Sequence, residues 1–115
     1  MTRRWTTFFA AALLVAVTTG VGTAQQESIE EIRARAEAGD ADAQNDLGLA
    51  YANGEGVPQD DVQAYMWLNL SASRSTGTSR ENAVEARDRV VNRLTPDQRA
   101  EAQRLTREWD EAHPQ

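Results

Sequence analysis

The chain has 115 residues, which is enough for one small domain. Its 18 acidic and 12 basic residues give a net charge of −6, and an acidic surface repels nucleic acid and anionic lipid, so neither is expected as a partner. The chain has no cysteine, which excludes a disulfide, a thiolate nucleophile and a lipidated-cysteine anchor.

The first residues have the layout of a secretory signal peptide. Arg3 and Arg4 form a basic start, residues 8–17 are all apolar, and small residues precede a cleavage point after Ala24. The apolar run is about half of the ~20 residues that a membrane span needs, which disfavours an uncleaved anchor. We therefore expect residues 1–24 to be a cleavable signal peptide, and the protein to be exported to the periplasm of a Gram-negative bacterium.

The remaining region, residues 25–115, carries all the acidic side chains and ten arginines, a net charge of −8. Helix patterns dominate it, and no alternating strand pattern occurs. A first helix is predicted to start after Ser28, with Glu31 completing a capping box, and to run to about Ala38, where Gly39 ends it.

A second helix is predicted to begin after Asp40, a residue type favoured as a helix N-cap. Asn53 and Gly54 end it, and residues 54–58 form a tight connection that a helix could not cross. One apolar stripe with helical spacing consists of Ala43, Leu47, Ala50 and Tyr51.

A third helix is predicted to begin after Asp60 and to be apolar almost all round, which is typical of a helix packed between neighbours. Its apolar residues are Val62, Ala64, Tyr65, Met66, Trp67, Leu68 and Leu70. Residues 71–79 are rich in Ser, Thr and Gly and predict a loop.

A fourth helix is predicted over residues 80–93, with Glu85 and Arg89 as a supporting ion pair on its outer side. Its inward side chains are predicted to be Ala83, Val84, Val90, Val91 and Leu94. A Thr-Pro start at residues 95–96, with Gln98 completing a capping box, predicts a fifth helix. The side chains that it turns toward the core are predicted to be Ala102, Leu105, Trp109 and Ala112.

Residues 41–73 resemble the SEL-one-like repeat, a relative of the tetratricopeptide repeat. The matching positions are Ala43, Gln44, Leu47, Gly48, Tyr51, Gly54, Gly56, Val57, Asp60 or Asp61, Ala64 and Trp67. Residues 83–109 look like the helical hairpin that often follows the last repeat in bacterial members. The resemblance implies an all-α fold, a short right-handed α/α superhelix (solenoid) of about five helices over residues 25–115. Within it we expect a clear repeat at about 41–76 and a degenerate or capping helix pair at about 80–112.

Members of this family usually stack several repeats, whereas one clear copy is present here. Since about three repeats are normally needed for a stable solenoid, the C-terminal pair is expected to cap the stack, or the chain to self-associate. Gly48 and Ala64 are interpreted as small residues where two helices approach closely. Trp67 and Trp109 lie on core-facing stripes, which favours packing over a ligand-stacking role.

No catalytic site is evident in the sequence. The single histidine, His113, lies near the end and is expected to be disordered. The absence of lysine excludes a lysine nucleophile or Schiff base. The acidic pairs at 40–42 and 60–61 are interpreted as helix-start residues that complement the helix dipole. A calcium loop from Asp40 is disfavoured because Asn45 stands where such a loop needs glycine. We predict no catalytic residue, no cofactor and no metal ligand.

The outward positions of the second helix, Asn45, Asp46, Leu49 and Asn53, are the predicted partner-binding residues. Leu49 falls outside the main apolar stripe, and an alternative is that it contacts the first helix. The resemblance implies an adaptor rather than an enzyme, so we expect a non-catalytic protein-interaction module of the cell envelope that binds a protein or peptide. The net charge of −8 makes a basic partner the favoured class. Two alternatives stay open: a small cell-wall or antibiotic-interacting enzyme, and a purely structural subunit of an envelope complex.

Overall fold

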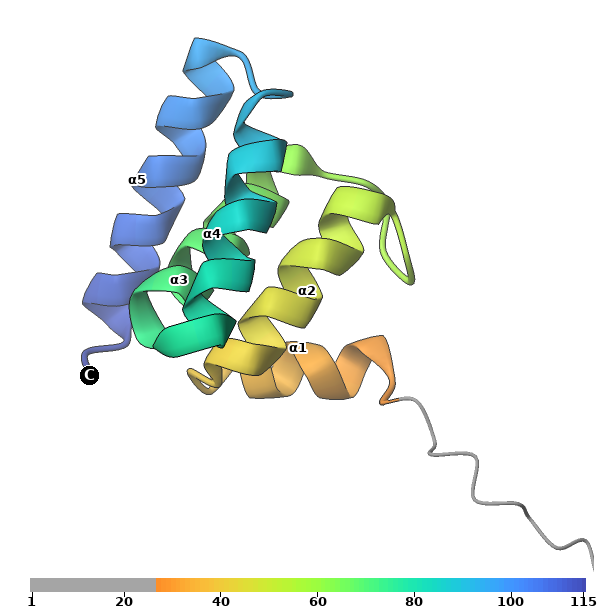
Figure 1. The fold of residues 1–115 in the computed structure, drawn as a ribbon, viewed down its shortest axis with the longest axis vertical. Coiled ribbons are helices and arrows are strands. Elements are labelled where there is room, and N and C mark those ends of the chain that lie inside the picture. The colour runs from red at the N-terminus through yellow and green to blue at the C-terminus, as the bar shows by residue number, and fades with distance from the viewer. Residues whose placement is uncertain (1–26) are drawn as a thin grey trace, which may run out of the picture.

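The computed structural model describes residues 27–115, so the predicted signal peptide, residues 1–24, lies outside the described residues. Within residues 27–115 the chain forms five helices and no strand, which confirms the expected all-α fold (Figure 1). None of these helices combines the length and the apolar character that a membrane span requires. The helices are α1 (Ile29–Glu37), α2 (Ala41–Asn53), α3 (Asp61–Arg74), α4 (Gly77–Val91) and α5 (Pro96–Ala112).

The helix starts follow the predicted caps. The Asp40 carboxylate accepts hydrogen bonds from the first backbone N–H groups of α2 at 3.0 and 3.1 Å, and Asp60 accepts one from α3 at 3.1 Å. Thr95 and Gln98 form the complete capping box of α5. At Ser28, one bond of the predicted capping box forms: the Glu31 N–H donates to the Ser28 side-chain oxygen at 3.2 Å. These local signals placed four of the five helix starts correctly, because capping groups satisfy backbone N–H groups that the helix leaves free.

The end of α2 shows why glycine stands at position 54. Gly54 has φ +67° and ψ 38°, the left-handed conformation in which a Cβ atom clashes with the backbone. Its N–H donates to the Ala50 carbonyl, and the Asp60 N–H donates to the Tyr51 carbonyl at 3.0 Å. The predicted stop after Asn53 is confirmed, and the connection satisfies carbonyls at the end of α2.

The predicted loop over residues 71–79 is wrong. The helix α3 continues to Arg74 and α4 begins at Gly77, which leaves a two-residue connection. The reason is tertiary packing: Ser71 is buried at 1% exposure, and its hydroxyl donates to the Ala41 carbonyl at 2.7 Å. The small polar residues that resembled a loop are therefore a helical segment packed on the start of α2.

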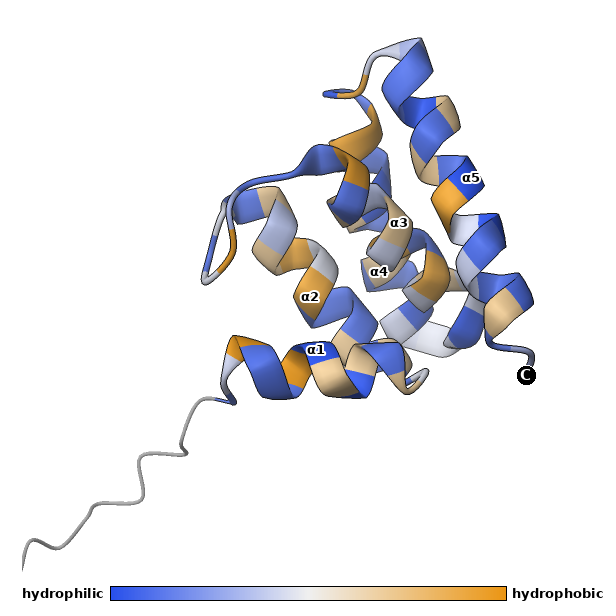
Figure 2. Cartoon of the chain, turned by 180° about the vertical axis from the view of Figure 1, so that it is seen from behind, coloured by the Kyte–Doolittle hydropathy of each residue, from blue (hydrophilic) through white to orange (hydrophobic). Residues whose placement is uncertain are grey.

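The central helix is α3, which contacts α2, α4 and α5, while α1 packs across α2 (Figure 1). Figure 2 shows hydrophilic residues over much of the exposed ribbon of α5, with apolar residues interspersed. The core consists of two clusters, and residues of α3 belong to both. The first cluster contains Ala52, Ala64, Tyr65, Leu68, Ala86, Val90 and Ala102. The second contains Ala36, Ala43, Leu47, Met66, Trp67 and Leu70. The prediction that the third helix is sandwiched between neighbours is confirmed.

The contact between α2 and α3 is closest at Gly48. A Cβ atom added there would lie 2.7 Å from Leu68 Cγ and 3.2 Å from the Ala64 carbonyl oxygen. Leu68 is fully buried and has no free space to move into. The interpretation of Gly48 and Ala64 as small residues at a close helix contact is confirmed.

The inward faces of α4 and α5 differ in part from the prediction. Ala83 and Val90 are buried as expected, and Ala86 is buried although it was not predicted. In α5, Thr106 is buried, and Ala112 is exposed rather than core-facing. At about 100° per residue, the stripe that includes Ala102 returns to the core at 106 and 109, whereas 112 is turned away from it. The Thr106 hydroxyl donates to the Ala102 carbonyl at 2.8 Å, which permits its burial.

The prediction that His113 is disordered is also wrong. Its imidazole stacks on the Trp109 indole, with ring centroids 3.9 Å apart and planes 10° from parallel. The Arg74 guanidinium lies 4.6 Å from the centroid of the same indole, and one of its nitrogens donates to the His113 carbonyl at 2.8 Å. The end of α5 is therefore fastened to the end of α3.

Candidate functional site

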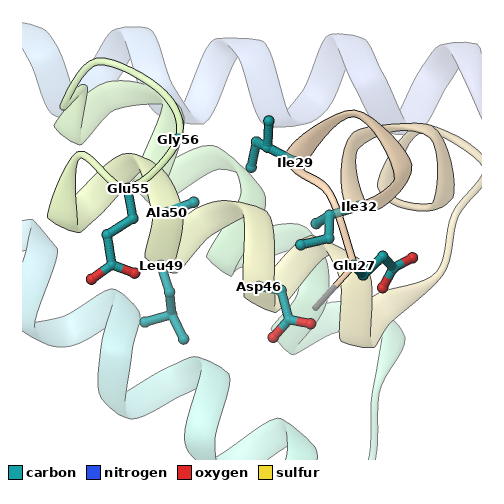
Figure 3. A pocket seen from close by; sticks show the side chains of 8 residues that line it. All are labelled: Glu27, Ile29, Ile32, Asp46, Leu49, Ala50, Glu55 and Gly56. Atoms are coloured by element: carbon teal, nitrogen blue, oxygen red, sulfur yellow. The ribbon is translucent and has the colours of Figure 1, made fainter. Parts of the chain in front are cut away.

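A hollow of about 560 Å³ opens on the surface beside α1 and α2 (Figure 3). Its residues come from the segment that begins α1, from α1 itself, from the outer face of α2 and from the connection after α2. They are Glu27, Ile29, Ile32, Asp46, Leu49, Ala50, Glu55 and Gly56. A hollow of this size is within the range of small-molecule and peptide-side-chain sites.

The floor of the hollow is aliphatic. Ile29 and Ile32 pack against one core cluster and Leu49 packs against the other, and all three side chains are half-buried. Ala50, beside Leu49, is 8% exposed. Because the core supports each side chain from below, the apolar floor is preformed and presents its upper side to solvent.

The rim of the hollow is acidic. Figure 3 shows the carboxylates of Glu27, Asp46 and Glu55 around the aliphatic side chains. Glu27 forms an ion pair with Arg35, which also contacts Asp40 at 3.0 Å. Within residues 27–115, Asp46 and Glu55 form no ion pair. The rim therefore keeps negative charge that a cationic partner could neutralise.

The electrostatic environment of Asp46 differs from that of a freely hydrated carboxyl. Partial loss of water beside the hollow raises the pKa of Asp46 above its ordinary value of 3.8, and the carboxylates of Asp42, Glu27 and Asp40 raise it further. The Arg35 guanidinium opposes this increase. At neutral pH the Asp46 carboxylate is thus less well stabilised than it would be in open water.

A second, polar hollow of about 200 Å³ lies between α2 and α4 and shares Asp46 with the first. The other lining residues are Asp42 and Asn45 of α2 and Ser79 and Asn82 of α4. The Asn45 side-chain oxygen is buried and accepts no hydrogen bond from residues 27–115. The two hollows therefore meet at Asp46 on α2, one with an aliphatic floor and the other lined by polar side chains.

The predicted partner-binding residues divide between these hollows. Asp46 and Leu49 meet in the first, and Asn45 and Asp46 meet in the second. Asn53 is exposed but lines neither hollow. Leu49 packs on a core cluster of α2, α3, α4 and α5 residues, and its exposed side shares the hollow with Ile29 and Ile32. Whether these residues bind a partner stays a prediction.

Sequence reasoning missed the half of the hollow that other elements supply. Ile29 and Ile32 have the i, i+3 spacing of one helix face in α1, whose other residues are charged or alanine, and this signal was present in the sequence. Glu27 and Glu55 gave no such signal, because they are far apart in the chain and the fold alone brings them together. Their contribution could not be found without the packing of α1 on α2.

Among residues 27–115, no group of three or more His, Cys, Asp or Glu side chains is placed to hold a metal ion. The single histidine, His113, lies at the end of α5, where its ring stacks on Trp109 and contacts the Trp109 carbonyl at 2.8 Å. A further hollow of about 310 Å³ lies at the turn between α4 and α5 and contains Arg99.

The comparison with protein families identifies the segment that contains α2, the helix shared by both hollows. Residues 41–75 match the Sel1 repeat, and the match covers α2, the following connection and α3. No curated protein and no solved structure matches the chain.

Proposed function

Residues 41–75 make this chain a Sel1-repeat protein, and on that premise we propose that it is an exported, non-catalytic adaptor that binds another protein in the cell envelope. Sel1 repeats generally mediate protein–protein interaction. The observation that carries the proposal for this chain is the open hollow beside α2, where aliphatic side chains that the core holds in place face solvent. Preformed apolar surface with polar edges is what a protein partner buries.

Photo-crosslinking in cells tests the proposal. A photo-reactive amino acid at Asn53 or Asp46 would report on the outer face of α2, and the same amino acid at Arg107 or Glu111 would report on exposed positions of α5. We expect crosslinks to one defined protein from the α2 positions and none from the control positions. Capture of no protein at any position, or equal capture at all four, would contradict an adaptor function of this face.

The export part of the proposal rests on residues 1–24, with their basic start, their apolar run and the small residues that precede the expected cleavage between Ala24 and Gln25. Mass spectrometry of the protein from a periplasmic fraction is the direct measurement. We expect a mass that lacks residues 1–24. Retention of the whole chain in a membrane fraction would replace the exported adaptor with an anchored one.

The alternative of a purely structural subunit is distinguished from an adaptor by how the protein behaves when it is isolated. A self-sufficient adaptor is expected to be a folded monomer when isolated, because the C-terminal helix pair covers α3. A subunit that needs its complex would unfold or aggregate without it. Sedimentation and circular dichroism of the isolated protein distinguish the two.

One observation favours a second candidate function, a small cell-wall-hydrolysing enzyme. Asp46 has a raised pKa and lines the same hollow as Glu27 and Glu55, and a carboxyl group with a shifted pKa in a hollow is typical of acid–base catalysis. Partial dehydration at the edge of an apolar docking site explains the same shift, and Glu27 is held by Arg35. Release of soluble fragments from purified cell walls, abolished by Asp46→Asn, would favour the enzyme over the adaptor.

A further inference from the structure

We propose that the hollow beside α1 and α2 binds a segment of a partner protein in which an aliphatic side chain lies next to an arginine or lysine. This inference rests on the proposed adaptor function and deepens it, since it specifies which part of the partner is recognised. Its two halves, the aliphatic floor and the acidic rim, are supplied by different elements of the fold.

The floor selects the aliphatic side chain. Ile29, Ile32 and Leu49 are each half-buried, and each is packed against the core on its inner side. Burial of their outer sides against an aliphatic group removes apolar area from water without a rearrangement of the domain. Gly56 borders the floor beside Ile29, where a Cβ atom would make an ordinary van der Waals contact at 3.4 Å from Ile29 Cβ.

The rim selects the cation. Asp46 and Glu55 border the floor, and within the described part of the chain neither carboxylate has an arginine partner. A guanidinium or ammonium group placed there would favour the Asp46 carboxylate, which partial loss of water and the neighbouring carboxylates disfavour and which the Arg35 guanidinium already favours. A charge-assisted hydrogen bond of this kind is stronger than a neutral one.

Acceptors continue past Asp46 along α2. Asp42 and Asn45 line the adjoining polar hollow, together with Ser79 and Asn82 of α4. A second donor of the bound segment would find these groups on the α4 side of the aliphatic floor. Along the direction from α1 across α2 to α4, the bound segment is therefore expected to place its aliphatic group first and its cationic and hydrogen-bond-donating groups after it.

Charge argues against a second copy of this chain as the occupant. Residues 27–115 carry ten arginines and eighteen acidic residues, so two copies repel each other. The chain's own N-terminal segment contains Arg3 and Arg4 beside apolar residues and is the internal competitor. The proposal commits to a separate partner, and the experiment below distinguishes all three.

The test is selection from a random-peptide phage-display library on the protein isolated from expressing cells. We expect enriched peptides to combine Leu, Ile or Val with a nearby Arg or Lys. A synthetic enriched peptide should bind about tenfold more weakly to Asp46→Asn or Glu55→Gln, the loss expected for one charged hydrogen bond. The matched controls Glu108→Gln and Glu111→Gln, which change the net charge equally at exposed sites on α5, should bind normally.

Amide chemical shifts locate the bound peptide. Changes centred on Ile32, Asp46, Leu49 and Glu55 support the proposal, whereas changes centred on the Arg99 hollow overturn it. Enrichment of acidic or uncharged peptides, or equal binding by the rim variants and the controls, overturns it as well. Concentration-dependent dimers, or shifts at the hollow that require residues 1–24 and no peptide, would assign the hollow to a different occupant and also overturn it. If crosslinking from Asn53 captures a partner while these peptide results fail, this inference fails and the adaptor function stands.

Discussion

Trp109 meets Trp67 edge to face, with ring centroids 5.9 Å apart and planes inclined at 68°. This geometry places the positive edge of one indole against the negative face of the other, which stabilises the pair beyond its area burial. Trp67 is 5% exposed, so the contact joins α5 directly to the core. Two further side chains, Arg74 and His113, also lie against the Trp109 indole.

Removal of residues 113–115 should therefore destabilise the domain by about 1 kcal/mol, the usual contribution of an aromatic stacking contact. The matched control removes residues 114–115 alone and keeps the His113 ring on Trp109. Urea unfolding followed by tryptophan fluorescence measures both. Equal stability of the two truncated chains would show that the stacked His113 contributes nothing.

Gly48→Ala should lower the free energy of unfolding. The new methyl group would lie 2.7 Å from Leu68 Cγ, and overpacking of this kind costs about 1–3 kcal/mol. The higher helix propensity of alanine returns only about 1 kcal/mol. Thermal unfolding of Gly48→Ala, Leu68→Ala and the double variant gives the coupling, and additive effects would contradict the close contact.

Asp40 should stabilise the domain above its pKa. It caps α2 and pairs with Arg35, and the hydrogen bond from the Ala43 N–H, together with the Arg35 guanidinium, lowers the pKa of Asp40 below 3.8. Asp40→Ala should cost about 1–2 kcal/mol at neutral pH, whereas Asp40→Asn keeps a capping side chain and should cost less. Because the folded-state pKa is depressed, this contribution is present above pH 3.8 and is lost as the pH falls through the folded pKa. Denaturant unfolding at neutral and acidic pH checks the sign, and a constant difference between wild type and Asp40→Asn would contradict it.

The contribution of Asp46 to the pH dependence of stability should have the opposite sign to that of Asp40. Its folded-state pKa is raised, so the folded chain binds more protons than the unfolded chain between pH 3.8 and the raised value, and stability falls as the pH rises through that interval. Asp46→Asn should therefore be at least as stable as the wild type at neutral pH, with an advantage that disappears below pH 3.8. The same denaturant titrations measure it. A less stable Asp46→Asn at neutral pH would show that the carboxylate has a structural role.

Deletion of residues 54–58 should unfold the domain. The segment contains the left-handed Gly54 and the buried Val57, and it leads to the Asp60 N–H that donates to the Tyr51 carbonyl. Without it α2 and α3 cannot turn back on each other. Loss of a cooperative thermal transition in circular dichroism is the expected result, and a retained transition would contradict the assignment of this helix pair.

The features predicted correctly from sequence are those that local chemistry determines. The caps Asp40, Asp60 and Thr95, and the stop at Gly54, each act within a few residues of their own position. The predicted loop over residues 71–79 failed because burial of Ser71 against α2, a contact between residues 30 positions apart, outweighed a local preference for a turn.

The candidate site follows the same division. Asp46 and Leu49 could be chosen from sequence because both stand off the apolar stripe of α2. Glu27 and Glu55 could not, since they border the same hollow only after α1 packs across α2 and the connection folds back. Sequence pattern located one wall of the hollow, and the remaining walls are a product of tertiary structure.

Because α3 is buried on both sides, the matched repeat and the folding unit are not the same segment of the chain. Tyr65 and Leu68 belong to a cluster with Ala86, Val90 and Ala102, which all lie beyond the matched repeat. A polypeptide that ends at residue 75 would lack half of that cluster and expose Tyr65 and Leu68 to water, so we expect that the repeat does not fold on its own. A longer protein made by duplication of the repeat would therefore need its new copies before α4 and α5, because this helix pair covers the apolar face of the last repeat.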